Sequence, residues 1–187
     1  MRYLLTISML LFALVGIAQD VGGSSYTSTR TVTRQVPDTT MDPLEVEEEF
    51  KKIYLDFCKR RHYPVRYSDF LDTVVIIHLN YLTNHEENMI THHQLDVPKY
   101  RTVGDRLYSV YPYHVGDYAE IAIMGNISTD NTPRQEAQLF FDSFMKSTGH
   151  RKIMIQKKFR SYAFKFKYNI HGWMVGVGVF TEIRRYD

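Results

Sequence analysis

The chain has 187 residues, and its 23 Lys and Arg against 21 Asp and Glu give a formal net charge of +2. This near balance argues against a nucleic-acid-binding protein, which would carry a strong basic excess on one face. Cys58 is the only cysteine, so no disulfide can form within the chain, and a hydrophobic core must provide its stability.

Residues 1–18 have the layout of a secretory signal peptide. Arg2 provides a short positive start, an apolar stretch follows, and Gly16 and Ala18 place small residues before a cut after Ala18. A permanent membrane helix needs about 20 apolar residues, so a retained anchor is the weaker alternative. We therefore expect a secreted or periplasmic protein with no stable membrane span after cleavage.

Residues 19–41 are rich in Ser and Thr and lack a helical or strand period. This composition predicts a disordered linker, because such a segment buries too little apolar surface to fold. The remaining residues, 42–187, are expected to form one domain.

Two helices are expected at the start of that domain. Asp42 and Pro43 are typical of a helix start, and an apolar stripe continues to about Lys59. Cys58 lies in this helix and is interpreted as a buried small hydrophobe. A second helix is expected from about Asp69 to His85. Its inner face holds the following side chains: Phe70, Leu71, Val74, Val75, His78 and Leu82.

The middle of the chain begins with an irregular segment, residues 86–118, and a loop of this length is often functional. A short strand of small and β-branched residues is expected over 119–124. Thr132 and Pro133 then start a third long helix, and Gly149 is expected to end it.

The last third of the chain is expected to be β structure. Residues 164–168 alternate between aromatic residues and lysine, residues 169–172 form a turn, and residues 173–183 are almost entirely apolar. This pattern predicts an antiparallel hairpin whose second strand is central in the sheet. Gly176 and Gly178 indicate a bulge or the close approach of another element. The class is therefore α+β, with helices packed on a sheet.

Four polar residues are candidates for a shared site: His92, His93, Glu120 and His150. Glu120 interrupts an apolar strand, where a carboxylate must face solvent or find a partner. Imidazole and carboxylate groups that converge could serve acid–base or metal chemistry. The alternative is that His92 and His93 are ordinary loop residues and that His150 interacts with the end of a helix. The sequence contains no phosphate-binding glycine loop, HExxH motif or GxSxG motif.

Several of these segments resemble the bacterial branch of the CAP superfamily, the SCP-like domain of cysteine-rich secretory proteins, antigen 5 and pathogenesis-related 1 proteins. Residues 118–122 resemble the family's Gly-Glu-Asn strand, and residues 147–154 resemble its Ser-Pro-Gly-His-Arg-x-Asn-Ile stretch. His92-His93 followed by Arg106-Leu107 resembles the family's first histidine and a later Arg-Leu pair. The resemblance covers about residues 44–183. The Gly and Asn that flank the family's glutamate are absent here, as are the Pro and the later Asn of the histidine stretch.

The resemblance implies a three-layer α-β-α sandwich with a central cleft lined by two histidines and a glutamate. Carried to this chain, the cleft residues would be His93 or its neighbour His92, together with Glu120 and His150. Some family members hold a divalent metal in the cleft, so His93, Glu120 and His150 are the implied ligands for zinc, calcium or magnesium.

Three functions follow as hypotheses. The first is an exported binding or interaction module without catalytic activity, whose extracellular or envelope ligand is unknown. The second is a metal-assisted hydrolase in which His93, Glu120 and His150 activate water. The third is a purely structural role in the envelope. The sequence contains no convincing catalytic nucleophile, which favours the first.

Overall fold

The computed structural model describes residues 39–113 and 116–182. The expected signal peptide and most of the expected linker lie outside these residues. None of the described helices is long and apolar enough to cross a membrane. The elements in chain order are α1 (Pro43–Arg60), β1 (Arg66–Tyr67), α2 (Asp69–Asn84), the 3-10 helix η1 (Pro98–Tyr100), α3 (Val103–Val110), β2 (Tyr118–Gly125), α4 (Pro133–Lys146), α5 (Thr148–Met154), β3 (Ser161–Tyr168) and β4 (Met174–Thr181).

The four strands form one mixed sheet in the order β1-β3-β4-β2. β1 is parallel to β3, whereas β4 is antiparallel to both β3 and β2. The predicted C-terminal hairpin is therefore confirmed, and β4 is central as its apolar sequence indicated. β4 is buried along its whole length because strands cover both of its edges and helices cover both faces of the sheet.

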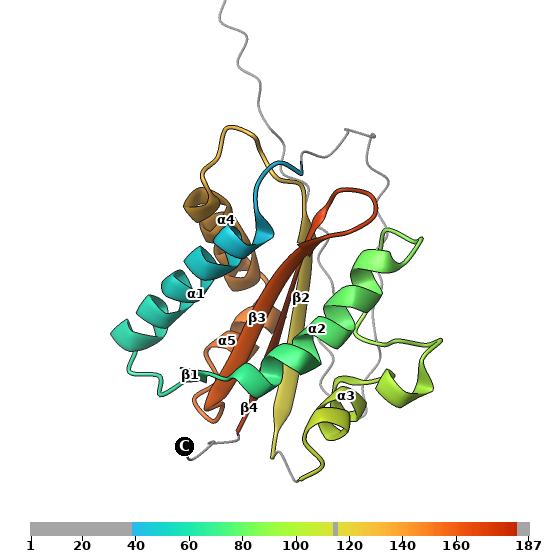
Figure 1. Ribbon diagram of the computed structural model, residues 1–187. Coiled ribbons are helices and arrows are strands. Elements are labelled where there is room, and N and C mark those ends of the chain that lie inside the picture. Colours follow the sequence, from blue (N-terminus) through green and yellow to red (C-terminus); the bar gives the residue numbers. More distant parts are fainter. Residues whose placement is uncertain (1–38, 114–115, 183–187) are drawn as a thin grey trace, which may run out of the picture.

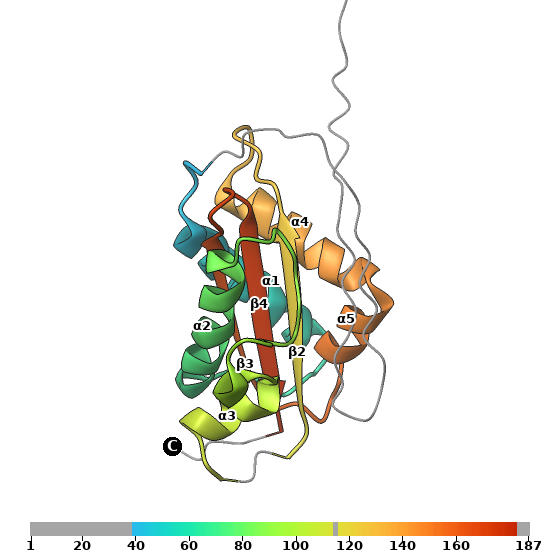
Figure 2. The ribbon, with the colours of Figure 1, turned by 90° about the vertical axis from the view of Figure 1, so that its right-hand side faces the viewer.

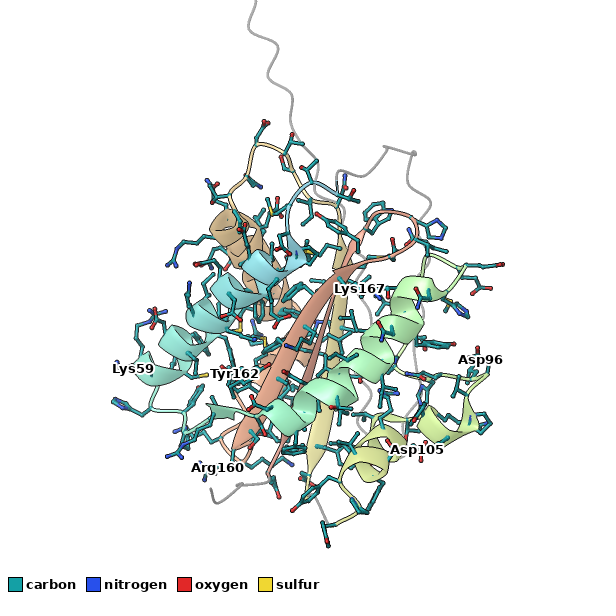
Figure 3. All side chains as sticks on the ribbon, viewed as in Figure 1. Lys59, Asp96, Asp105, Arg160, Tyr162 and Lys167 are labelled. Atoms are coloured by element: carbon teal, nitrogen blue, oxygen red, sulfur yellow. The ribbon has the colours of Figure 1, made fainter. Side chains whose placement is uncertain are left out.

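Helices pack on both faces of the sheet, which confirms the α+β class. α1 and α4 lie on one face, while α2 and α3 lie on the other (Figures 1 and 2). Each face has its own apolar core: the α1/α4 side is rich in aromatic rings, and the α2/α3 side is mostly aliphatic. Figure 3 shows Lys59, Asp96 and Arg160 at the rim of this arrangement, with Tyr162 between α1 and the sheet.

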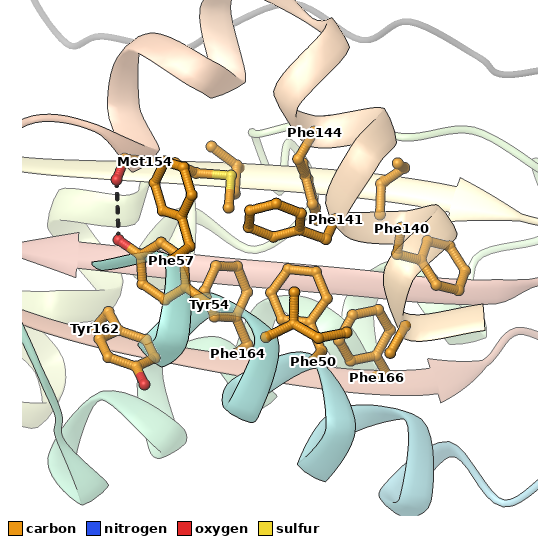
Figure 4. Close-up of a cluster of buried hydrophobic side chains, with 14 of the residues drawn as sticks. Phe50, Tyr54, Phe57, Phe140, Phe141, Phe144, Met154, Tyr162, Phe164 and Phe166 are labelled. Atoms are coloured by element: carbon orange, nitrogen blue, oxygen red, sulfur yellow. Dashed lines mark hydrogen bonds between the residues drawn. The ribbon is translucent and has the colours of Figure 1, made fainter. Parts of the chain in front are cut away.

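The aromatic core explains the glycines of β4. Phe50 packs edge-on against Phe164, with ring centroids 4.6 Å apart, and lies among several other rings (Figure 4). Gly178 pairs with Phe164, and a Cβ at Gly178 would overlap Cε1 of the Phe164 ring. Gly176 is related to Phe166 in the same way, with a separation of 2.5 Å. The predicted close approach at both glycines is thus an aromatic ring lying over bare backbone.

Capping groups fix two of the predicted helix starts. The Asp42 carboxylate accepts the backbone N–H of Leu44 at 2.9 Å, which starts α1. Thr132 and Gln135 form a reciprocal capping box that starts α4. Cys58 is buried in α1, as expected, and burial raises the pKa of its thiol to about 11.

Two helices differ from the sequence prediction. α3 lies within the segment that was expected to be irregular, and its start is stabilised by a capping box between Thr102 and Asp105; Asp105 is labelled in Figure 3. The prediction that Gly149 ends the third long helix is wrong. α4 ends at Lys146, and Ser147 both terminates α4 and caps α5, so Gly149 lies inside α5.

Candidate functional site

Glu120 is the centre of the candidate site. It lies in β2 and is fully buried. Ala119 and Ile121 face the α1/α4 core, while Ala122 and Met124 face the α2/α3 core. Because side chains alternate along a strand, the Glu120 carboxylate is directed to the α2/α3 side. Of the two options that the sequence left open for Glu120, solvent or a partner, its burial leaves only the second.

The first partner is Arg106 of α3. Its Nη2 lies 2.5 Å from Glu120 Oε2, and both side chains are fully buried. Arg106 Nη1 also donates to the carbonyl of Tyr100 at 3.0 Å, while its Nε has no partner among the described residues. Burial alone would raise the pKa of Glu120, but Arg106 and the neighbouring imidazoles outweigh it and hold this pKa below its ordinary value. Glu120 is therefore a carboxylate at neutral pH.

The second partner is His92, in the loop between α2 and η1. His92 Nδ1 lies 3.1 Å from Glu120 Oε1, and the ring is buried. A carboxylate can only accept, so Nδ1–H donates, and in a neutral ring with this tautomer Nε2 holds the lone pair. His92 Nε2 is buried and has no hydrogen-bond partner among the described residues. The site thus contains an imidazole whose second nitrogen is free to bind a donor.

The sequence prediction preferred His93 over His92 for this position, and the structure reverses that order. His93 is partly exposed, and its backbone N–H donates to Thr91 Oγ1 at 3.1 Å. Adjacent residues of an extended loop point in opposite directions, so only one of the two rings can reach Glu120.

His78 of α2 is a third group beside Glu120. Its Nε2 lies 2.7 Å from the carbonyl oxygen of Thr91 and 3.4 Å from Glu120 Oε1. Its Nδ1 lies 3.1 Å from Gln94 Nε2. The ring is fully buried, and burial lowers the pKa of His78 to about 4. His78 is therefore a neutral member of the cluster at physiological pH.

His150 lies on α5, beside β2 (Figure 2). It is the third residue of that helix, not a residue beyond a helix end as the sequence indicated, and the Ser147 hydroxyl accepts its backbone N–H. The ring is buried and packs edge-on against Phe144 at 5.3 Å. Burial, with a smaller contribution from His92, lowers the pKa of His150 to about 4. Its Nε2, like that of His92, has no hydrogen-bond partner among the described residues.

The expected metal triad of His93, Glu120 and His150 is not assembled. Both Glu120 oxygens are taken by Arg106 and His92, and His93 is not in contact with the carboxylate. Across residues 39–113 and 116–182, no three His, Cys, Asp or Glu side chains are grouped so that they could hold a metal ion. Among the described residues, the buried imidazole nitrogens without a hydrogen-bond partner are His92 Nε2 and His150 Nε2.

Sequence reasoning missed His78 and Gln94. His78 was assigned to the inner face of its helix among aliphatic residues, and a histidine in such a stripe was a usable signal. Gln94, two residues after His92, gave no signal, because an isolated glutamine in a loop fits solvent exposure equally well. Arg106 entered only through the family resemblance.

Comparisons with known proteins identify the fold alone. No protein-family model matches this chain, and no curated protein matches it. Among solved structures, the chain is similar to an outer surface protein from Borrelia burgdorferi, with a TM-score of 0.55 and 16% sequence identity. The match covers 74% of this chain and 96% of that chain.

Proposed function

We propose that this chain is an exported, CAP-like binding module that takes its ligand at His92 and His150, beside the buried Glu120–Arg106 ion pair. The ligand is expected to be extracellular or to belong to the cell envelope. The signal-like pattern of residues 1–18 supports export, as does the similarity to a protein described as an outer surface protein. Helices on both faces of the sheet are compatible with the CAP-like three-layer sandwich.

One observation carries the proposal: within the described part of the chain, two buried imidazole nitrogens have no hydrogen-bond partner. Leaving a buried acceptor unsatisfied costs about 1–3 kcal/mol, so a fold retains such an atom only when other interactions compensate. Glu120 fixes the orientation of His92 by accepting its Nδ1–H, which directs the unpaired Nε2 away from the carboxylate. A ligand with a hydrogen-bond donor would satisfy this nitrogen.

The geometry favours binding over metal-assisted hydrolysis. A catalytic zinc site typically has three protein ligands, whereas in the part of the chain that the structure describes two buried imidazole nitrogens lack a partner, those of His92 and His150. Calcium and magnesium prefer oxygen ligands, but the oxygens of Glu120 are held by Arg106 and His92. Zinc is the one expected metal whose preference for imidazole fits the free atoms, and it would be a weakly held ligand, not a catalytic centre.

An imidazole-detected NMR titration of the purified protein tests the proposal. The probes are zinc, calcium and magnesium chlorides and a panel of small alcohols, amides and primary amines. A ligand of this site should shift the ring signals of His92 and His150 and leave those of exposed His62 unchanged. A His92→Phe variant should lose the response. If every probe leaves the His92 and His150 signals unchanged, the proposed binding site is wrong.

A further inference from the structure

A single buried ring on α2 contacts the chain on both sides of His92. His78 Nε2 lies 2.7 Å from the carbonyl of Thr91, the residue directly before His92. His78 Nδ1 lies 3.1 Å from the side-chain nitrogen of Gln94, two residues after His92. His92 is therefore bracketed by two hydrogen bonds to the same imidazole.

The partners fix the protonation state of His78 without ambiguity. A backbone carbonyl only accepts, so the Nε2 that contacts Thr91 must carry the hydrogen. Gln94 Nε2 also lies 3.4 Å from the carbonyl of Ile77, which identifies this end of the amide as the donor. His78 Nδ1 must therefore accept. One hydrogen on Nε2 and a lone pair on Nδ1 describe a neutral ring with both nitrogens satisfied.

The charges around His78 agree with a neutral ring. Glu120 on β2 lies 3.4 Å away, and its negative charge is paired with Arg106 of α3. On its own helix, His78 stacks against Tyr81 with ring centroids 6.1 Å apart. A second buried cation next to Arg106 would have no carboxylate of its own within this cluster, so protonation of His78 is unfavourable.

We infer that His78, with Gln94 as its partner, is a positioning residue that holds the His92 ring on Glu120. The loop has other hydrogen bonds here: Gln94 N–H donates to the Arg101 carbonyl at 2.9 Å, Gln94 Nε2 to the Ile77 carbonyl at 3.4 Å, and Thr91 Oγ1 contacts the backbone of His93. The hydrogen bonds of His78 tie the loop to α2, which packs against β3 and β4. This fixes the backbone of His92 at the distance that Nδ1–H needs to reach Glu120.

This inference rests on the proposed role of His92 as a ligand-binding residue, but it is tested in the free protein. In His78→Leu, both hydrogen bonds to the loop are lost. The ring signals of His92 should then broaden or split, because Nδ1–H is no longer held on Glu120. His78→Gln keeps a donor toward Thr91 and should retain the signals more nearly as in the wild type.

Val74→Ala is the matched control. Val74 is a fully buried residue of the same helix in the aliphatic core, and its truncation lowers stability while leaving both hydrogen-bonding partners of His78 in place. The His92 signals should stay unchanged in this variant. Gln94→Leu removes the hydrogen bond between Gln94 Nε2 and His78 Nδ1, and it replaces His78→Leu as the test variant if His78→Leu does not fold. The inference is overturned if His92 is unaffected in the folded His78 or Gln94 variant, or if Val74→Ala changes it equally.

Zinc binding gives a second readout. Loss of an outer-shell partner typically lowers metal affinity by about 10- to 100-fold. His78→Leu should weaken zinc binding within this range, because it releases His92 from Glu120, the outer-shell partner of its ring. If zinc and the other probes fail to bind the wild type while His92 still responds to His78→Leu, the proposed function fails and the positioning role stands. If the probes bind the wild type and the His92 signals do not respond to His78→Leu, the positioning role fails and the proposed function stands.

Discussion

His92 Nδ1 lies 3.1 Å from Glu120 Oε1, and both side chains are buried. This contact joins a loop residue to a strand residue 28 positions away. It sets the donor and acceptor roles of both groups, because the carboxylate can only accept. The chemistry available to a ligand is therefore that of His92 Nε2, and the carboxylate itself acts as a fixed support.

The buried ion pair between Arg106 and Glu120 should be essential for stability. We expect Arg106→Met to lower the free energy of unfolding by about 3–5 kcal/mol, because it leaves the Glu120 charge buried without its cation. Urea denaturation measures the change. Arg134→Met is the control, since Arg134 pairs with Glu49 while 65% exposed, and should cost less than about 1 kcal/mol. Equal costs in the two variants would show that the buried pair has no special role.

Acid should destabilise the fold well above the pH at which carboxylates titrate. His78 and His150 have a pKa of about 4 when folded, against 6.5 as the ordinary value. Between these values the unfolded chain binds more protons, so stability is full above pH 6.5 and falls toward pH 4. Each ring contributes up to about 3 kcal/mol to this loss.

Urea midpoints measured from pH 7.5 to pH 4.5 test this slope. His150→Phe keeps a ring against Phe144 and removes one titrating group, so its slope should be shallower than that of the wild type. His62→Asn is the control: His62 is exposed at a φ of 55°, which Asn tolerates, and its slope should match the wild type. A wild-type midpoint that is constant over this range contradicts the buried neutral state of both histidines.

Gly178 should not tolerate a side chain. A Cβ there would overlap the Phe164 ring, so Gly178→Ala must displace that ring from a packed core. We expect a loss of about 1–3 kcal/mol in the free energy of unfolding. Phe164→Leu removes the clash at its source, so the two changes combined should cost less than the sum of the single changes. If the two stability costs are strictly additive, Gly178 is not required to make room for the Phe164 ring.

Cys58 should be unreactive while the protein is folded. It is 2% exposed, and burial raises the pKa of its thiol to about 11. Little thiolate therefore exists near neutral pH, and a thiol reagent in solution has no access to the buried sulfur. A thiol-reactive dye should label the protein only after denaturant is added. Rapid labelling of the native protein at pH 8 would show that α1 opens readily from the sheet.

The elements that were predicted correctly are those with a strong local signal. The long stripes of α1 and α4 each bury one face, and the apolar run of β4 is buried on both faces, so these patterns follow directly from the packing. α3 has eight residues and includes Gly104, and a helix this short depends on tertiary contacts such as those of buried Arg106. α5 was hidden because Ser147 serves two helices at once.

The candidate site was predictable only in part. Glu120 could be identified because an acid inside an apolar strand requires a partner. The choice between His92 and His93 could not be made, since an irregular loop has no period that separates an inward from an outward residue. His78 and Gln94 meet across 16 positions, and this pairing depends on the path of the loop over α2.

The protonation map of His92 tests the central claim most directly. Long-range ¹H–¹⁵N NMR of the free protein at pH 7.5 distinguishes a protonated from an unprotonated ring nitrogen. The account predicts that the neutral ring of His92 carries its hydrogen on Nδ1, held by Glu120, so that Nε2 is the nitrogen open to a ligand. A neutral His92 ring with its hydrogen on Nε2 would contradict it.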